Sequence, residues 1–145
     1  MDQITTKPYW MRSSDVPDFP ALDRDLSVDV AIVGGGVVGI STAYLLKAAG
    51  LTVAVLEREQ YAMRDSGHTT AHLTMVTDEL LSDLVKNFGR DTATAVWDAG
   101  RMAIDRIEAT IAAERIDCDF QRVPGFLHTA LSGTGLSKDA LREQA

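Results

Sequence analysis

The chain has 145 residues, of which 46% are hydrophobic and 24% charged, and its formal net charge is −7. This composition is that of a globular protein long enough to bury a core, and the acidic balance argues against nucleic acid or an anionic membrane surface as a partner. A single cysteine, no secretory leader pattern and no apolar run near about 18 residues predict a cytoplasmic protein without a disulfide framework or a membrane span.

Residues 1–27 are expected to form an irregular N-terminal arm. Three of the four prolines lie in this part, and few of its apolar residues are periodic. Its larger apolar side chains are expected to attach the arm to the body of the fold rather than to bind a ligand. These side chains are Tyr9, Trp10, Phe19 and Leu22.

Residues 28–57 have the pattern of one strand–helix–strand unit. The run 28–33 is short and β-branched, which is typical of a buried parallel strand, and 37–49 has the composition and spacing of a helix. Gly50 stands where helices commonly end, and 52–56 returns to a strand pattern. This order predicts an α/β fold that begins with a Rossmann-like βαβ unit.

Three glycines between the first strand and the helix fit the pattern G-x-G-x-x-G. Gly34 would allow the tight turn, Gly36 would let the backbone contact a pyrophosphate, and Gly39 would let the helix lie close to the strand. The N–H groups of Val37 and Val38, at the positive end of the helix dipole, would face that pyrophosphate. The pattern predicts dinucleotide binding but does not choose between FAD and NAD.

Glu57 follows the second strand, 23 residues after Gly34. A carboxylate at this place can accept hydrogen bonds from both hydroxyls of an adenosine ribose. It would also repel a 2′-phosphate, which argues against NADP, although Arg58 follows directly and weakens that exclusion.

A small polar cluster follows in the loop 58–74. Its members could donate N–H and O–H groups to a phosphate or to a flavin edge, although a plain surface turn is equally compatible with the pattern. His68 and His72 have a spacing that metal ligands use, but no matching Cys, Asp or Glu stands nearby, so no metal site is predicted. The cluster consists of Ser66, Gly67, Thr69 and Thr70.

The remaining pattern predicts two helices and a third strand region. Apolar spacing indicates a helix over 77–88 that stops at Gly89, and a helix of roughly 25 residues over 91–116 with an apolar core side. The run 120–131 has a strand pattern, which Pro124 restricts to a sheet edge or a bulge.

No catalytic residue is assigned from these segments. Arg122 and His128 could face a substrate cavity, or could equally lie at a solvent-exposed sheet edge. Cys118 is expected to be a small core residue, because no nearby base or helix N-terminus would make it a thiolate. The end of the chain, from Ser137, has the pattern of a short polar helix that would not be stable alone, which suggests an N-terminal piece of a larger protein.

Three separated segments of the chain read DVAIVGGGVVGISTAYLLKAAGLTVAVLER, SGHTTAHLT and IDCDFQRVPGFLHTA. In this order they resemble the N-terminal part of the D-amino-acid oxidase (DAO) superfamily of FAD-dependent oxidoreductases. The tracts KPYW and DFPALDRDLSVDV resemble the subgroup whose members often carry a C-terminal Rieske iron–sulfur domain. The resemblance covers about residues 8–131, nearly the whole chain.

The resemblance implies that the cofactor is FAD. The glycine turn with Val37 and Val38 would contact the pyrophosphate, Glu57 and Arg58 would flank the adenosine ribose, and the polar cluster of the loop 58–74 would line the ribityl and isoalloxazine side. Relatives usually have a glycine-rich turn before this cluster, where the chain has Ala62, Met63, Arg64 and Asp65.

The resemblance also implies oxidation of a C–N bond in an amine or amino acid by hydride transfer to flavin, with a downstream Rieske domain as a further partner. The expected organisation is an arm (1–27), a FAD-binding unit (28–74), a helical segment (75–117) and the start of a substrate-domain sheet (118–145), an incomplete domain that would be inactive alone. Two alternatives stay open, which are an NAD-dependent dehydrogenase domain and a non-catalytic, truncated dinucleotide-binding fragment.

Overall fold

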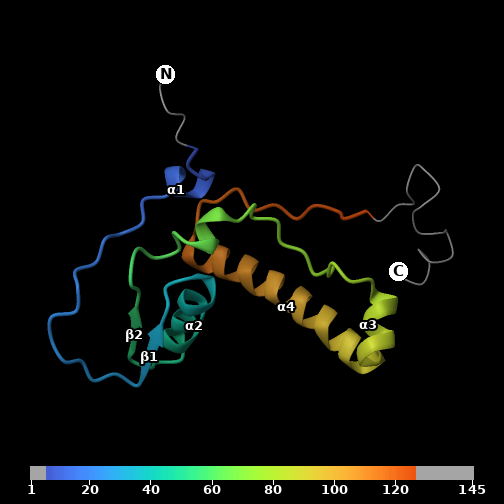
Figure 1. Cartoon of the computed structure of the whole chain (residues 1–145), viewed down its shortest axis with the longest axis horizontal. Helices are drawn as coiled ribbons and strands as arrows, with labels where there is room; N and C mark the ends of the chain where they lie inside the picture. The colour runs from blue at the N-terminus through green and yellow to red at the C-terminus, as the bar shows by residue number, and fades with distance from the viewer. Residues whose placement is uncertain (1–5, 127–145) are drawn as a thin grey trace. The chain divides into compact units, whose positions relative to one another are not determined.

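The computed structural model describes residues 6–126 (Figure 1). Contacts divide the chain into two compact units, Met1–His72 and Leu73–Ala145. The first unit holds all the β-structure of the described residues, and the second holds the last two of their helices. The described part is therefore mixed α/β, with a parallel β-α-β unit near its start.

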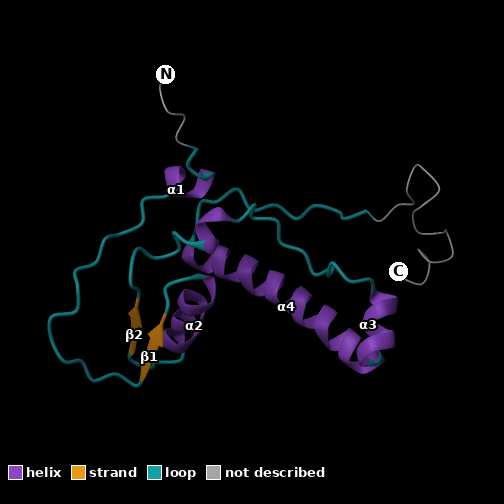
Figure 2. Ribbon diagram, in the orientation of Figure 1, coloured by secondary structure: helices purple, strands orange, loops and turns teal. Residues whose placement is uncertain are grey.

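The β-α-β unit consists of β1 (Val30–Val33), α2 (Val37–Ala48) and β2 (Val53–Leu56). The strands pair in parallel with Val30 opposite Val53, and α2 packs on both of them (Figure 2). This confirms the predicted order of strand, glycine turn, helix and strand. Both strands are shorter than predicted, and assignments of strand ends commonly differ by a residue or two.

The end of α2 is fixed by Gly50, as the sequence predicts. Gly50 has φ +89°, and its N–H donates to the C=O of Lys47 at 3.0 Å. The N–H of Leu51 donates to the C=O of Leu46 at 3.1 Å. These two bonds satisfy carbonyls that the helix end leaves without partners, and the chain can then reverse into β2.

The N-terminal arm contains one helical turn that the sequence pattern does not predict. This turn is α1 (Tyr9–Ser13), which packs against the 3₁₀ helix η1 (Asp65–His68). The indole Nε1 of Trp10 donates to the C=O of Thr69 at 2.9 Å. The rest of the described arm is irregular, as expected.

Two of the four expected attachment points join the arm to the rest of the first unit. Trp10 does so through its hydrogen bond to Thr69, and the ring of Phe19 packs edge-on against Tyr61 with 5.3 Å between centroids. Tyr9 and Leu22 are 63% and 55% exposed, and their part in holding the arm stays a prediction.

The second unit is built from α3 (Leu81–Phe88) packed against α4 (Arg90–Glu114). The helix predicted from Thr77 begins only at Leu81, because the Thr77 hydroxyl donates to the C=O of Glu79 at 2.7 Å and favours a local turn. Gly89, with φ +83°, ends α3 and immediately precedes α4. Within residues 6–126, no helix is both long and apolar enough to cross a membrane.

The contact between α3 and α4 contains the buried hydrophobic residues of the described chain. Leu84 is 7% exposed and Ala93 is 1% exposed. Trp97 and Gly100 lie on the same side of α4 as Ala93 and are half-buried. A Cβ at Gly100 would lie 3.0 Å from the Cα of Met75, so the chain before α3 passes close to this helix. The apolar side predicted for this helix is only partly covered: Trp97, Gly100, Ile104 and Ile111 are half-buried, whereas Val96, Ala103 and Ile107 are exposed.

Two predictions for the segment after α4 are corrected. Residues 120–126 form no strand, because a strand requires a paired neighbour and none of the described residues pairs with this segment. Cys118 is exposed rather than buried, because it lies in this irregular segment. Residues 127–131 of the predicted strand, His128 and the predicted helix from Ser137 lie outside the described residues.

Candidate functional site

The glycine turn joins β1 to α2. Gly34 has φ +106°, which residues with a side chain rarely adopt, and its N–H donates to the C=O of Leu56 at 2.8 Å. A Cβ at Gly39 would collide with the carbonyl oxygen of Gly34 and lie 3.4 Å from Cγ2 of Ile32. Gly34 therefore permits the change of direction, and Gly39 permits the close approach of α2 to β1.

The first turn of α2 meets the hydroxyl of Ser66. The N–H of Val37 donates to Ser66 Oγ at 3.0 Å. A Cβ at Gly36 would meet only this same oxygen, at 3.6 Å, so the space beside the turn is open. The N–H of Val38 belongs to the same first turn, where the helix supplies no acceptor. The fold thus brings Ser66 to the helix N-terminus, a contact that the sequence pattern does not predict.

Glu57 lies directly after β2, and both of its carboxylate oxygens accept backbone hydrogen bonds. Oε1 accepts the N–H of Glu59 at 3.0 Å, and Oε2 accepts the N–H of Gly35 at 2.7 Å. These bonds, the one from Glu59 first, hold the pKa of Glu57 below its ordinary value of 4.5. The carboxylate is therefore ionised at neutral pH and keeps lone pairs for further donors.

Arg58 extends away from this network into solvent. Its side chain is 83% exposed, and Nη2 lies 3.6 Å from Oε1 of Glu59. An exposed guanidinium at this distance gains little from the ion pair. It can reorient toward a ligand at Glu57 with little loss of structure.

The rest of the predicted polar cluster lies on η1 and directly after it. Gly67 is buried, and a Cβ there would lie 2.8 Å from the carbonyl oxygen of Ala62. Thr69 is tied to α1 through its C=O, and its hydroxyl accepts the N–H of Ala71 at 3.1 Å. Thr70 is exposed. The structure therefore links Ser66 directly to the glycine turn, and it links Thr69 to the N-terminal arm.

The two histidines of this loop have separate surroundings. Nδ1 of His68 lies 2.8 Å from the C=O of Arg64, and His72 is exposed. Across residues 6–126, no group of three or more His, Cys, Asp and Glu side chains is arranged to hold a metal ion.

Arg122, a candidate for substrate contact, is paired with two carboxylates of α4. Its Nη2 lies 2.5 Å from Oδ1 of Asp105 and 2.7 Å from Oε2 of Glu108. Hydrogen bonds to these carboxylates, the one to Glu108 first, raise the pKa of Arg122 above its ordinary value. Its charge is already compensated within the second unit, which makes a substrate contact less favourable. His128, the other candidate, lies outside the described residues.

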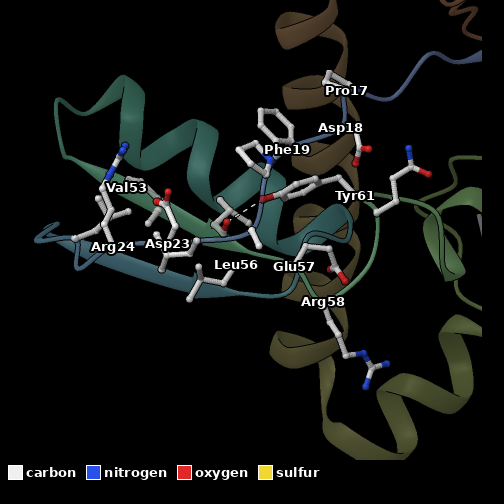
Figure 3. Close-up of a pocket in the computed structure, with 17 residues that line it drawn as sticks. Pro17, Asp18, Phe19, Asp23, Arg24, Val53, Leu56, Glu57, Arg58 and Tyr61 are labelled. Atoms are coloured by element: carbon white, nitrogen blue, oxygen red, sulfur yellow. Dashed lines mark hydrogen bonds between the residues drawn. The ribbon is translucent and has the colours of Figure 1, made fainter.

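A groove of about 750 Å³ lies between the N-terminal arm and β2 (Figure 3). The hydroxyl of Tyr61 donates to the C=O of Val55 at 2.9 Å on one side of it. Glu57 and Arg58 are part of its lining, so the groove adjoins the candidate ribose position. It is lined by residues 17–24, 26, 53–58, 60 and 61.

Gly35 and Tyr61 belong to the site, although the glycine pattern does not assign them a role. Gly35 is buried, and a Cβ there would lie 2.9 Å from Cε1 of Tyr61 and 3.1 Å from Cβ of Glu57. The available signal is the unbroken run of three glycines, because G-x-G-x-x-G leaves its second position unrestricted.

These residues fit the ADP half of a dinucleotide such as FAD. The open space beside Gly36 leaves room for a phosphate, and the helix N-terminus provides N–H donors and a positive dipole end. Glu57 supplies an ionised acceptor, which its hydrogen bond from the Gly35 N–H holds beside the same turn. The N–H donors for a phosphate and the carboxylate acceptor for a ribose therefore lie at the same glycine turn.

Comparisons with known proteins agree with this fit. Residues 29–145 match the family model described as FAD dependent oxidoreductase (DAO). The putative Rieske 2Fe-2S iron-sulfur protein YhfW of Bacillus subtilis is 38% identical over 122 residues, which are 84% of this chain and 24% of that protein. No solved structure matches the chain.

Two further relatives are oxidoreductases by name. Gamma-glutamylputrescine oxidoreductase of Escherichia coli is 30% identical over 148 residues, covering 99% of this chain and 33% of that protein. The probable oxidoreductase OrdL of Haemophilus influenzae is 30% identical over 114 residues, covering 79% and 26%. The chain spans between 24% and 33% of the length of these three relatives.

Proposed function

Because the chain belongs to the DAO family of FAD-dependent oxidoreductases, we propose that it forms the FAD-binding start of an enzyme that oxidises C–N bonds of amines or amino acids. The observation that carries this proposal is the hydrogen bond from Gly35 N–H to Glu57 Oε2. It joins the candidate ribose acceptor to the candidate pyrophosphate turn. The two ends of an ADP group require this proximity.

The proposed FAD pyrophosphate lies on the turn formed by Gly34, Gly36 and Gly39. The N–H group of Val38 would donate to it at the start of α2, whereas that of Val37 is bonded to Ser66 Oγ. The ribose would lie at Glu57, with Arg58 beside it. The turn itself carries no cationic side chain, so the backbone would supply most of the attraction for the phosphates.

Ser66 extends the proposed phosphate site. Its oxygen accepts the N–H of Val37, and its own O–H remains available to donate to a phosphate oxygen. Gly67, Thr69 and Thr70 follow from η1 and are proposed to line the ribityl and isoalloxazine side. This last assignment rests on the family resemblance.

When bound, FAD would accept a hydride from the carbon that carries the amine, and the resulting imine would hydrolyse in water. The described residues of this chain would bind and orient the ADP half of the cofactor. The substrate class is proposed from the relative named gamma-glutamylputrescine oxidoreductase, which favours an amine. No residue within 6–126 is proposed as catalytic.

The test is a flavin absorbance spectrum of the purified protein at its natural length, after unbound flavin is removed. We expect that the protein retains flavin and that the absorbance of this flavin decreases when an amine or amino acid reduces it under anaerobic conditions. Retention of NAD instead of flavin would favour the dehydrogenase alternative. A bound flavin that no amine or amino acid reduces would leave the cofactor assignment standing and remove the proposed reaction.

A Rieske-type iron–sulfur centre is proposed as a further part of the protein at its natural length. The support is the 38% identity to the putative Rieske protein YhfW. Such a centre uses two cysteines and two histidines, and this chain has only Cys118. At least one of the two cysteine ligands would therefore lie outside these 145 residues. Iron and acid-labile sulfide analysis tests this, and their absence from freshly purified protein would contradict it.

A further inference from the structure

Gly35 is held at both of its backbone polar groups by the segment that follows β2. Its N–H donates to Oε2 of Glu57 at 2.7 Å, and its C=O accepts the N–H of Ala62 at 2.9 Å. The middle residue of the glycine turn is therefore bound at two points by residues that are only five positions apart in the sequence.

The ring of Tyr61 closes the remaining side of Gly35. A Cβ at Gly35 would collide with Cδ1 of this ring and lie 2.9 Å from Cε1, so the ring occupies the space that a side chain would need. Only a glycine allows the turn and the ring to pack this closely. The ring thus packs against the turn and supports it from this side.

The position of the Tyr61 ring is itself fixed from two directions. Its hydroxyl donates to the C=O of Val55 in β2 at 2.9 Å, a bond that Figure 3 shows as a dashed line. Phe19 of the N-terminal arm packs edge-on against the ring, with the planes at 79°. The arm therefore reaches the glycine turn through one aromatic pair.

Ala62 contributes a strained backbone to the same contact. Its φ of +57° is in the left-handed region that non-glycine residues seldom adopt. Such a conformation persists when its surroundings hold it, and here the bond to Gly35 C=O is part of that support. The loop and the turn consequently constrain each other.

We propose that Tyr61 is a positioning residue for the dinucleotide. Its ring packs against Gly35 and so fixes the turn on which the pyrophosphate lies, and Phe19 of the arm holds the ring in place. The proposal rests on the proposed binding of FAD. Backbone N–H donors must be held within a fraction of an ångström to bind a phosphate well. A turn without this packing contact would sample positions in which its N–H groups bind the phosphate more weakly.

The test is a double-substitution cycle of Gly35→Ala and Tyr61→Ala in the protein at its natural length, stripped of flavin and titrated with FAD. Tyr61→Ala is expected to weaken FAD binding about tenfold, and Gly35→Ala about a hundredfold, because each displaces the turn. The double variant is expected to bind FAD more tightly than Gly35→Ala alone, because removal of the ring makes room for the new methyl group.

Two control variants are matched to the cycle. One removes only the hydroxyl of Tyr61, and the other replaces a glycine elsewhere in the chain. Tyr61→Phe keeps the ring and is expected to bind FAD within a few-fold of the wild type. Gly125→Ala adds a methyl group where nothing lies within 4 Å and is expected to change nothing. Phe19→Leu is expected to weaken FAD binding by a few-fold, because the ring of Tyr61 loses its aromatic partner.

Each outcome of the cycle decides the proposal. If the losses of FAD affinity from the two single substitutions multiply in the double variant, packing of the ring against Gly35 does not position the turn. If Tyr61→Ala lowers only the melting temperature and leaves FAD affinity unchanged, Tyr61 has a structural role alone. If Gly35→Ala fails to fold, recovery of folding and FAD binding in the double variant supports the proposal, and failure to recover overturns it.

Failure of the proposed function is a separate result. A wild-type protein that binds no FAD removes the proposed function, and this positioning role falls with it. A wild-type protein that binds FAD without any coupling between Gly35 and Tyr61 removes the positioning role alone.

Discussion

The two ends of the parallel sheet use a carboxylate in different ways. At the amino ends of the strands, Oδ2 of Asp29 accepts the N–H of Thr52 at 2.8 Å and the hydroxyl of Thr52 at 2.6 Å. The N–H of Asp29 donates back to the same hydroxyl at 3.0 Å. At the carboxyl ends, Glu57 accepts N–H groups from Gly35 and Glu59.

The difference is in what each carboxylate connects. Asp29 and Thr52 satisfy each other across neighbouring strands, and this pair fixes the register of β1 on β2. Glu57 connects β2 to the glycine turn, at the end of a parallel sheet where ligands bind in α/β proteins. The same chemistry therefore stabilises the sheet at one end and organises a candidate binding site at the other.

The largest contrast is expected between glycines at the two ends. Gly36→Val should abolish FAD binding, because the side chain fills the space that the pyrophosphate needs, and it should change stability little because the φ of −79° suits any residue. Gly50→Ala should destabilise the fold by about 1–2 kcal/mol, because φ is +89°, and leave FAD affinity within a few-fold. Thermal unfolding and FAD titration measure the two effects.

An FAD affinity that survives Gly36→Val would move the pyrophosphate away from the turn. Loss of FAD binding in folded Gly50→Ala protein would mean that the two ends are not independent.

The next contrast is between the carboxylates themselves. Glu57→Ala is expected to weaken FAD binding by roughly ten- to a hundredfold, because charge-assisted hydrogen bonds to the ribose and the anchor of Gly35 are both lost. Asp29→Ala is expected to lower the melting temperature without changing the FAD affinity of the folded protein. An unchanged affinity in Glu57→Ala would place the ribose elsewhere.

Acid should affect the two ends through separate carboxylates. Hydrogen bonds lower the pKa of Glu57 from 4.5, chiefly that from Glu59, and the pKa of Asp29 from 3.8, chiefly that from the Thr52 hydroxyl. Each stabilisation is complete at neutral pH, weakens once the pH falls below the ordinary pKa, and is lost as the pH falls through the lowered pKa. FAD affinity should therefore fall in acid more steeply in the wild type than in Glu57→Gln.

Asp29→Asn is the matched control for acid sensitivity. It should flatten the acid dependence of the melting temperature while the pH profile of FAD affinity keeps its wild-type form. Identical affinity profiles for wild type and Glu57→Gln would show that Glu57 ionisation does not support binding.

The smallest effect is expected at Ala62, next to the carboxyl end. Ala62→Gly removes the cost of a left-handed backbone at φ +57°, about 1–2 kcal/mol, but adds the entropy cost of a glycine, about 0.5–1 kcal/mol. The net result should be a stabilisation between zero and about 1.5 kcal/mol, measured by denaturant unfolding. A clear destabilisation would show that the alanine methyl group makes contacts that outweigh the strain.

The local sequence was sufficient to predict the β-α-β unit because its information lies within about 30 residues. Gly34 and Gly50 have the positive φ values that their places in the pattern require, and Glu57 follows β2 directly. Each of these features depends on backbone geometry and on neighbours in the chain. No distant contact is needed to specify them.

Predictions that depended on distant partners were less successful. The strand expected over 120–131 is absent from residues 120–126, and Cys118 is exposed, because strand formation and burial depend on neighbours that the local pattern does not specify. Arg122 is paired with Asp105 and Glu108, which lie 17 and 14 positions away. Sequence spacing alone does not show such a pairing.

The sequence by itself determined that a glycine turn, a helix and an acidic residue after the second strand occur in the order that a dinucleotide site requires. Only the tertiary structure placed Ser66 on the N–H of Val37 and the ring of Tyr61 against Gly35. The physical reason is that backbone conformation follows from local residues, whereas side-chain contacts form only when separate segments of the folded chain meet.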